Sequence, residues 1–437
     1  MWTLKASIQG LIRIRDAREQ RNLPMDDPKW LLEASKVIEP NVDWEREEYF
    51  ANEVFADGVS ESTFKRFLYR TRIKARAFQA FCQVLGVNWK EVVEQDNENP
   101  AEFPFYIKRK NRENLECIED RCYKEIQKTG ALVRIKAPEK MGKTSLLEYV
   151  LDFSRTLGYH TVKLDFRLAD FSDYETLLKW ICLRVSESLE LEENLDNYWK
   201  ERYTTNDNCT RYFQNYLLSN IKNPLVFGLD SMDLIFEQPP EVANNFTKLI
   251  RYWNDEARST NNNISELWRK IRLVIVHSTE VYREMDINSS PLAGVGLVVE
   301  LPEFQPEQVL FLAQQHGLDW NASDIERLMT LTGGNPALVN IALDSAKQQN
   351  LSVEEILKLA TTEAGVFRNY LGRQLLNLRK SPELASAFLL CVSDQEPVEI
   401  DSQIAFKLHA MGLVKLRRNY VIPSCNLYRQ YFISRLA

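Results

Sequence analysis

The chain has 437 residues, a formal net charge of −7 at pH 7 and 44% hydrophobic residues. This length accommodates two to four domains with large cores, and the acidic balance excludes a generally basic nucleic-acid coat but not a local basic patch. Seven scattered cysteines without a CxxC pair indicate reduced thiols in a cytoplasm, and neither a signal peptide nor a membrane-spanning run is recognised.

Residues 1–98 predict a small helical module, because apolar residues recur there at helical spacing. Gly58-Val59-Ser60 predicts a turn, and Ser60 or Ser62 can cap the helix that follows it. The predicted helices contain the residue groups 11–14, 30–32, 64–68 and 77–85.

The helix after this turn has an aromatic side and a basic side. Residues 62–76 contain six basic residues and no acid, namely Lys65, Arg66, Arg70, Arg72, Lys74 and Arg76. This pattern over residues 58–76 is typical of a helix-turn-helix that binds DNA. Lysine and arginine would meet phosphates, with Lys65, Arg66 and Arg70 as the candidates, while Ser62 and Thr63 enter the major groove. The alternatives are a solvated face and a face that docks on an acidic protein partner.

A polar, proline-bearing linker at residues 97–104 precedes a segment in which β-like and helical runs alternate. Such alternation over residues 105–300 predicts an α/β fold with a parallel sheet that is covered by helices on both faces. Ligands of such sheets bind at the carboxyl ends of the strands. The predicted strands are residues 132–135, 161–166, 225–229, 273–276 and 295–301.

The first of these strands leads into a loop and then a helical run, which is the context of a phosphate-binding P-loop. Lys143 would reach the β/γ oxygens of ATP, and the Thr144 hydroxyl would ligate Mg²⁺. Alanine stands where the first glycine of the motif is usual, and it fits if that position needs no positive φ. An ordinary loop before a core helix is the alternative. The predicted nucleotide-binding residues are Ala137, Pro138, Glu139, Lys140, Met141, Gly142, Lys143, Thr144 and Ser145.

The third predicted strand closes on Asp230, where a carboxylate would hold Mg²⁺ opposite Thr144. A plain aspartate at a strand-end turn is the alternative. P-loop proteins that hydrolyse their nucleotide usually carry a glutamate directly after this aspartate. This chain has Ser231 there, and a hydroxyl is a poor base. Fast hydrolysis is therefore not expected. Asp233, acting through a water, is one candidate catalytic residue.

The fourth predicted strand ends near Ser278 and Thr279, and either hydroxyl could sense the γ-phosphate. A helix N-cap is an equally good interpretation of both residues. Ser278 is therefore the second candidate catalytic residue.

Residues 301–362 predict a helical lid, with helices at 306–316 and 323–331. Gly333-Gly334-Asn335 breaks the chain, and Pro336 fits the first turn of the next helix. Residues 363–437 predict helices, a β-hairpin around Asn419 and a closing helix, which together are typical of a winged helix.

Several strings resemble the AAA-like domain family common in cyanobacteria, P-loop ATPases close to the STAND signalling NTPases. They are residues 135–147, 272–282, 301–304, 332–336 and 407–414. Residues 58–68 and 78–86 resemble the helix-turn-helix module often fused ahead of such domains. The resemblance implies ATP and Mg²⁺ as ligands, with Lys143 and Thr144 on the phosphate and the ion and Asp230 on the ion.

In STAND-like proteins a Gly-x-Pro turn packs near the adenine, which makes Pro336 a candidate ATP contact; a plain helix connection is the alternative. Winged helices of that class commonly serve as intramolecular clamps, and this role is favoured here over DNA contact. Family members carry glycine at the position of Ala137 and glutamate at that of Ser231. These departures argue against the tightest nucleotide binding and, more strongly, against turnover.

The sequence thus predicts an ATP-binding regulatory switch that couples nucleotide state to DNA or a protein partner through its N-terminal module, with weak or absent hydrolysis. A nucleotide-dependent oligomer is left open. One alternative is an active ATPase that assembles on nucleic acid. The other is a pseudo-ATPase adaptor that does not respond to nucleotide.

Overall fold

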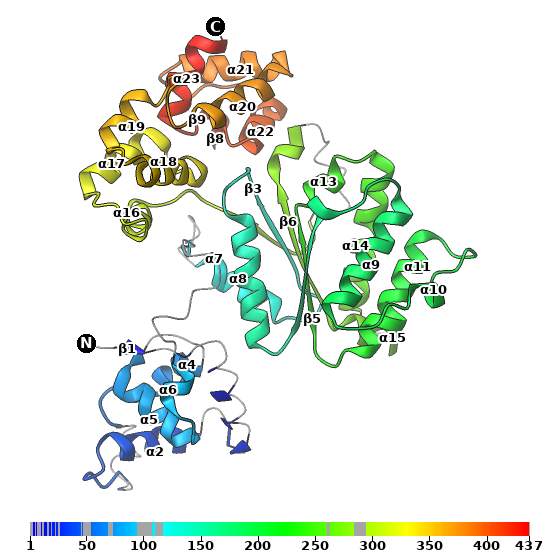
Figure 1. Ribbon diagram of the computed structural model, residues 1–437, viewed down its shortest axis with the longest axis vertical. Helices are drawn as coiled ribbons and strands as arrows, with labels where there is room; N and C mark the ends of the chain where they lie inside the picture. Colours follow the sequence, from blue (N-terminus) through cyan, green and yellow to red (C-terminus); the bar gives the residue numbers. More distant parts are fainter. Residues whose placement is uncertain are drawn as a thin grey trace. The chain divides into compact units, whose positions relative to one another are not determined.

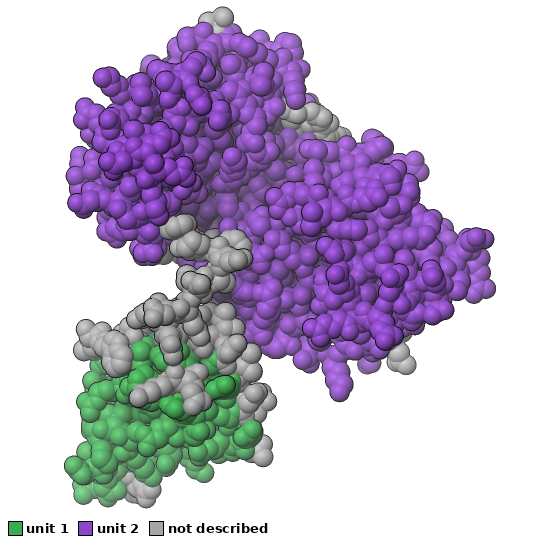
Figure 2. All heavy atoms as spheres, viewed as in Figure 1, with its two compact units in different colours: residues 1–104 green, residues 105–437 purple. Residues whose placement is uncertain are grey.

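The computed structural model comprises two compact units, residues 1–104 and 105–437 (Figure 2). None of the helices in the described part of the chain combines the length and the apolar run that a bilayer crossing requires. The residues described are 3–4, 6, 10, 13–14, 17–18, 20–21, 23–24, 27–44, 46, 54–68, 73–93, 107–109, 117–259, 263–283 and 294–436.

The first unit is helical around an aromatic core. The ring centroid of Phe64 lies 5.5 Å from that of Trp30 and 5.0 Å from that of Phe81. A short antiparallel pair of β1 and β2, which the sequence pattern did not indicate, joins its first residues to the segment before α5. The elements are β1 (Thr3–Leu4), α2 (Lys29–Ile38), α4 (Glu61–Leu68), β2 (Ile73–Lys74), α5 (Ala75–Leu85) and α6 (Trp89–Val92).

The second unit is built on a five-stranded parallel sheet in the order β4-β5-β6-β3-β7. Each of the five predicted strands is present, which confirms the α/β prediction. The strands are β3 (Leu132–Ala137), β4 (His160–Asp165), β5 (Leu225–Asp230), β6 (Ile271–Ser278) and β7 (Leu297–Glu300).

Helices cover both faces of this sheet because successive apolar side chains of a strand point to opposite faces (Figure 1). In β6, Val274 and Val276 join a core with α7 (Ile118–Ile126) and α8 (Lys143–Thr156). Leu273 and Ile275 of the same strand join another core with α9 (Tyr174–Ser188) and α14 (Pro240–Arg258). A strand that is apolar at successive positions therefore supplies side chains to both cores.

Gly228 in the middle of β5 lets α8 approach the sheet closely. A Cβ atom at this position would lie 2.9 Å from Cδ1 of Leu147 on α8. Because Lys143 and Thr144 begin α8, this close packing helps to set where the two side chains stand over the carboxyl edge of the sheet.

The smaller helices of the sheet region lie mainly in the connections between strands. They are η1 (Phe166–Leu168), α10 (Leu195–Tyr198), α11 (Thr205–Tyr212), the π-helical η2 (Phe213–Leu217), α12 (Leu218–Asn220), α13 (Asp233–Phe236), α15 (Asn263–Trp268) and η3 (Thr279–Arg283).

The remaining elements form one hydrophobic core that extends from Phe304 to Phe432. The predicted lid and the predicted winged helix therefore pack together. β8 and β9 form the expected antiparallel hairpin, with the turn at Arg418 and Asn419. The elements are α16 (Pro306–Gln315), α17 (Ala322–Thr332), α18 (Pro336–Gln349), α19 (Val353–Leu359), α20 (Arg368–Arg379), α21 (Pro382–Ser393), α22 (Ser402–Ala410), β8 (Val414–Arg417), β9 (Tyr420–Pro423) and α23 (Asn426–Leu436).

Candidate nucleotide site

The loop between β3 and α8 has the backbone that the sequence pattern indicates. Ala137 is the last residue of β3, where it pairs with Ser278 of β6, so it does not adopt a positive φ. Positive φ angles occur instead at Lys140 (59°) and Gly142 (88°). Alanine in place of the first glycine therefore imposes no backbone strain.

Lys143 is folded back onto its own loop. Its Nζ donates to the carbonyl oxygens of Ala137 at 3.0 Å and Pro138 at 2.7 Å. Burial lowers the pKa of this lysine, and nearby carboxylates, led by Asp233 and Glu280, oppose that shift. The ammonium group is thus held at the loop by acceptors that an incoming phosphate would have to replace.

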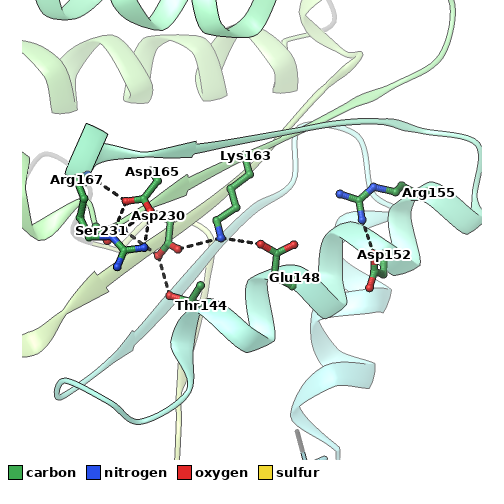
Figure 3. Close-up of polar contacts among 9 residues, drawn as sticks. All are labelled: Thr144, Glu148, Asp152, Arg155, Lys163, Asp165, Arg167, Asp230 and Ser231. Atoms are coloured by element: carbon green, nitrogen blue, oxygen red, sulfur yellow. Dashed lines mark hydrogen bonds and ion pairs between the residues drawn. The ribbon is translucent and has the colours of Figure 1, made fainter. Parts of the chain in front are cut away.

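Thr144 and Asp230 meet across the edge of the sheet (Figure 3). Thr144 Oγ1 donates to Asp230 Oδ1 at 3.2 Å, and the backbone N–H of Ser231 donates to the same oxygen at 2.9 Å. Asp230 is only 1% exposed, and burial raises its pKa against the opposing effect of Lys163. Mg²⁺ prefers hydroxyl and carboxylate oxygens. The convergence of these two oxygens therefore fits the ion.

Four further charged residues surround Asp230, and sequence reasoning missed them all. Lys163 on β4 lies between Asp230 and Glu148 of α8, while Asp165 at the end of β4 is paired with Arg167 (Figure 3). β4 and β5 are neighbours in register, with Asp165 opposite Asp230. Alternation along β4 could have placed residues 163 and 165 on one face, but only the strand order brings that face to Asp230.

The two candidate catalytic residues contact each other. The backbone N–H of Ser278 donates to Asp233 Oδ1 at 2.8 Å, so the Asp233 carboxylate ties the start of α13 to the end of β6. Ser278 Oγ accepts from the N–H of Glu280 at 3.4 Å. Thr279, the other sensor candidate, donates to the carbonyl of Ala410 at 2.6 Å. Asp233 and Ser278 both lie beside the loop, and each already has a structural hydrogen bond.

Pro336 is the first residue of α18, as the sequence predicts, and it is buried. Asn335 caps the helix by accepting from the N–H groups of Ala337 and Leu338. Gly334, at φ 73°, accepts a hydrogen bond from the N–H of Phe304. The observed role of this turn is to connect α17 and α18, and contact with adenine stays a prediction.

The C-terminal elements contact the phosphate loop itself. A Cβ on Gly412, in the turn after α22, would lie 2.9 Å from Cγ of Pro138. Arg373 of α20 forms an ion pair with Glu139 at 2.6 Å. These two contacts, Gly412 with Pro138 and Arg373 with Glu139, are here called the clamp contact. Together with the hydrogen bond from Thr279 to Ala410, the clamp contact joins α20 and α22 to the edge of the sheet where the loop lies (Figure 1).

His277, next to Ser278, should make the stability of the fold depend on pH. It is 3% exposed, and burial lowers its pKa from 6.5 to about 3. The unfolded chain therefore binds a proton that the folded chain excludes between those values. Stability should fall as pH drops from 6.5 toward 3, by up to about 1.4 kcal/mol per pH unit.

Chemical unfolding followed by tryptophan fluorescence at pH 4.5 and pH 7.5 measures this loss. His277→Gln should lose less stability than the wild type at the lower pH, whereas His160→Gln, at the half-buried start of β4, should behave like the wild type. Equal losses in all three proteins would show that His277 does not contribute.

In the first unit, Ser60 accepts the N–H of Thr63 at 3.1 Å and so caps α4, and its hydroxyl also hydrogen-bonds the side chains of Ser62 and Thr63. Lys65 pairs with Glu61. These contacts partly neutralise the predicted basic face and engage both hydroxyls proposed to enter a groove. Arg66 is exposed, whereas Arg70 and Arg72 lie outside the described residues.

Three comparisons place the chain among known proteins. The model of the AAA-like domain family matches residues 94–434. The chain is also similar to a Walker-type ATPase of Pyrococcus abyssi, with a TM-score of 0.51 and 14% identity over 75% of this chain and 99% of that one. An uncharacterised WD repeat-containing protein of Nostoc sp. is 50% identical over 93 residues, which are 21% of this chain and only 7% of that protein.

A parallel sheet with a Gly-Lys-Thr loop after β3 and a buried aspartate at the end of β5 defines a P-loop NTPase fold. The likeness to the Pyrococcus ATPase supports the same fold. The family match extends over most of the sequence, and the chain therefore belongs to the AAA-like domain family.

Proposed function

We propose that this protein is an ATP-binding regulatory switch in which the C-terminal elements respond to nucleotide at the phosphate loop. The observation that carries the proposal is the clamp contact, since Glu139 of the loop pairs with Arg373 and Pro138 lies close to Gly412. Nucleotide that moves these two loop residues is therefore expected to change the clamp contact. A ligand shifts such an equilibrium only by its different affinity for the two states.

In this proposal, Lys143 exchanges the carbonyls of its own loop for the β/γ-phosphate oxygens. Thr144 and Asp230 hold Mg²⁺, which, when bound, neutralises charge on the phosphates. The N–H groups at the start of α8 favour the same anion. Pro336 and the remaining loop residues shape the site around the nucleotide.

Slow or absent hydrolysis follows from the residues beside Asp230. Ser231 carries a hydroxyl where hydrolytic members of the wider class usually carry a glutamate that orients the attacking water, and Asp233 would have to give up its hydrogen bond to Ser278 to serve through a water. The proposed output is binding rather than turnover, with DNA or a protein partner recognised by the N-terminal module.

Calorimetric titration with ATP and ADP, with and without Mg²⁺, tests the switch beside a turnover assay. Binding with little turnover, and different affinities for ATP and ADP, is the expected result. Absence of binding at millimolar ATP would leave a pseudo-ATPase adaptor, and rapid Mg²⁺-dependent turnover would make the protein an active ATPase.

The DNA output predicts that the double substitution Lys65→Glu with Arg66→Glu abolishes a salt-sensitive mobility shift. Reversal of two charges adds repulsion from the phosphates, and the shift should weaken steeply with salt because phosphate contacts release counterions. Exchange of Lys248 and Arg251 to glutamate on α14 is the matched control and should leave the shift intact. No shift for the wild type at low salt would assign the module to a protein partner.

A further inference from the structure

Lys163 is placed where it affects the candidate metal ligand directly. Its Nζ lies 3.5 Å from Asp230 Oδ2 and 2.6 Å from Glu148 Oε1 (Figure 3). Asp230 Oδ1 is taken by Thr144 and the N–H of Ser231. The ammonium group therefore lies beside Oδ2, the oxygen of Asp230 that does not take part in these two hydrogen bonds. Lys163 reaches it from β4, the neighbour of the strand β5 that carries Asp230.

This ion pair is less exposed to solvent than an ordinary surface ion pair. The side chains of Asp230, Glu148 and Lys163 are 2%, 18% and 26% exposed, so solvent screens the three charges only in part. Lys163 bridges the strand and the helix that frame the site. A divalent cation on Asp230 would meet a fixed positive charge a few ångströms away, unless the ammonium group moved fully onto Glu148.

We propose that Lys163 is a built-in cation that competes with Mg²⁺ for Asp230, so that this site binds ATP with a weak dependence on Mg²⁺. The proposal rests on the proposed nucleotide site and states how its metal requirement is set. Glu148 is the second acceptor that draws Lys163 away when the ion enters. Lys163 is thus a positioning residue, and its effect should appear in the Mg²⁺ dependence of binding rather than in turnover.

The test is a titration of ATP binding with Mg²⁺, from EDTA to about 10 mM Mg²⁺, on the whole chain of 437 residues, because occupancy of the ion site follows mass action. In the wild type, EDTA should weaken ATP binding by less than about threefold. Lys163→Met should lower the Mg²⁺ concentration for half-effect by about tenfold or more, because the competing charge is gone. Lys179→Met is the matched control: it removes another lysine that pairs with a glutamate at 2.6 Å but stands on α9.

Glu148→Gln gives an independent test with the opposite sign, which matters if Lys163→Met fails to fold. Loss of this carboxylate leaves Lys163 with Asp230, so the Mg²⁺ concentration for half-effect should rise by about threefold or more. If ATP binds and depends on Lys143, but the Mg²⁺ dependence is the same in all variants, the competition is wrong and the nucleotide site stands. If the wild type binds no ATP with or without Mg²⁺, both proposals fail.

Discussion

Lys143→Ala is expected to weaken ATP binding by at least about 100-fold, which corresponds to about 2.7 kcal/mol. The lysine is half-buried beside the loop, and its ammonium group is the cation that would meet the β/γ-phosphates. Charge-assisted hydrogen bonds contribute about 1.5–3 kcal/mol each. The loss of two or more of them, together with the local charge, accounts for an effect of this size.

Equilibrium titration with labelled ATP measures this change. Lys248→Ala is the matched control, because Lys248 is an exposed lysine on α14 and its removal changes the net charge equally. The control should bind ATP like the wild type. An affinity of Lys143→Ala within threefold of wild type would mean that phosphate is bound elsewhere or not at all, and the switch would lose its ligand.

Gly412→Ala is expected to loosen the clamp contact and to lower the protection of the phosphate loop against amide hydrogen exchange. Gly412 has a φ of 73°, at which an alanine costs about 1–2 kcal/mol. Its new methyl group would also lie 2.9 Å from Pro138, a ring that cannot rotate away. The second cost falls on the contact between the C-terminal elements and the loop, so amide hydrogen exchange of residues 139–142 should accelerate at least about fivefold, which corresponds to about 1 kcal/mol of lost protection.

Gly317→Ala separates backbone strain from contact. Gly317 has a φ of 76°, but a Cβ there would meet nothing within 4 Å. In this variant, amide hydrogen exchange should accelerate only near the turn at Gly317 and should stay unchanged in the phosphate loop. Equal exchange in the loop of both variants would show that the clamp contact does not restrain it, and the link between nucleotide and the C-terminal elements would have to be sought elsewhere.

Local pattern was sufficient for much of this protein. The five strands are short apolar runs, the hairpin turns at Arg418 and Asn419, and Gly86 ends α5 in a left-handed conformation. Each of these features depends on neighbouring residues alone. The glycine-lysine-threonine loop is of the same kind, since the strand, the loop and the helix that form it are consecutive.

The surroundings of Asp230 could not be predicted in this way. Lys163 and Glu148 reach it because β4 is the neighbour of β5 and because Gly228 admits α8 closely. Strand order depends on how the helices pack on both faces, and no local pattern records it. The same applies to Gly412 and Pro138, which are far apart in sequence.

The sequence by itself determined the five strands of the parallel sheet, the α/β architecture and the family, because these depend on periodicity and on contiguous motifs. Only the tertiary structure decided that Lys163 covers the candidate magnesium ligand and that the C-terminal elements rest on the phosphate loop. The physical reason is that a charge acts on whatever lies within a few ångströms, and the fold chooses those neighbours from the whole chain.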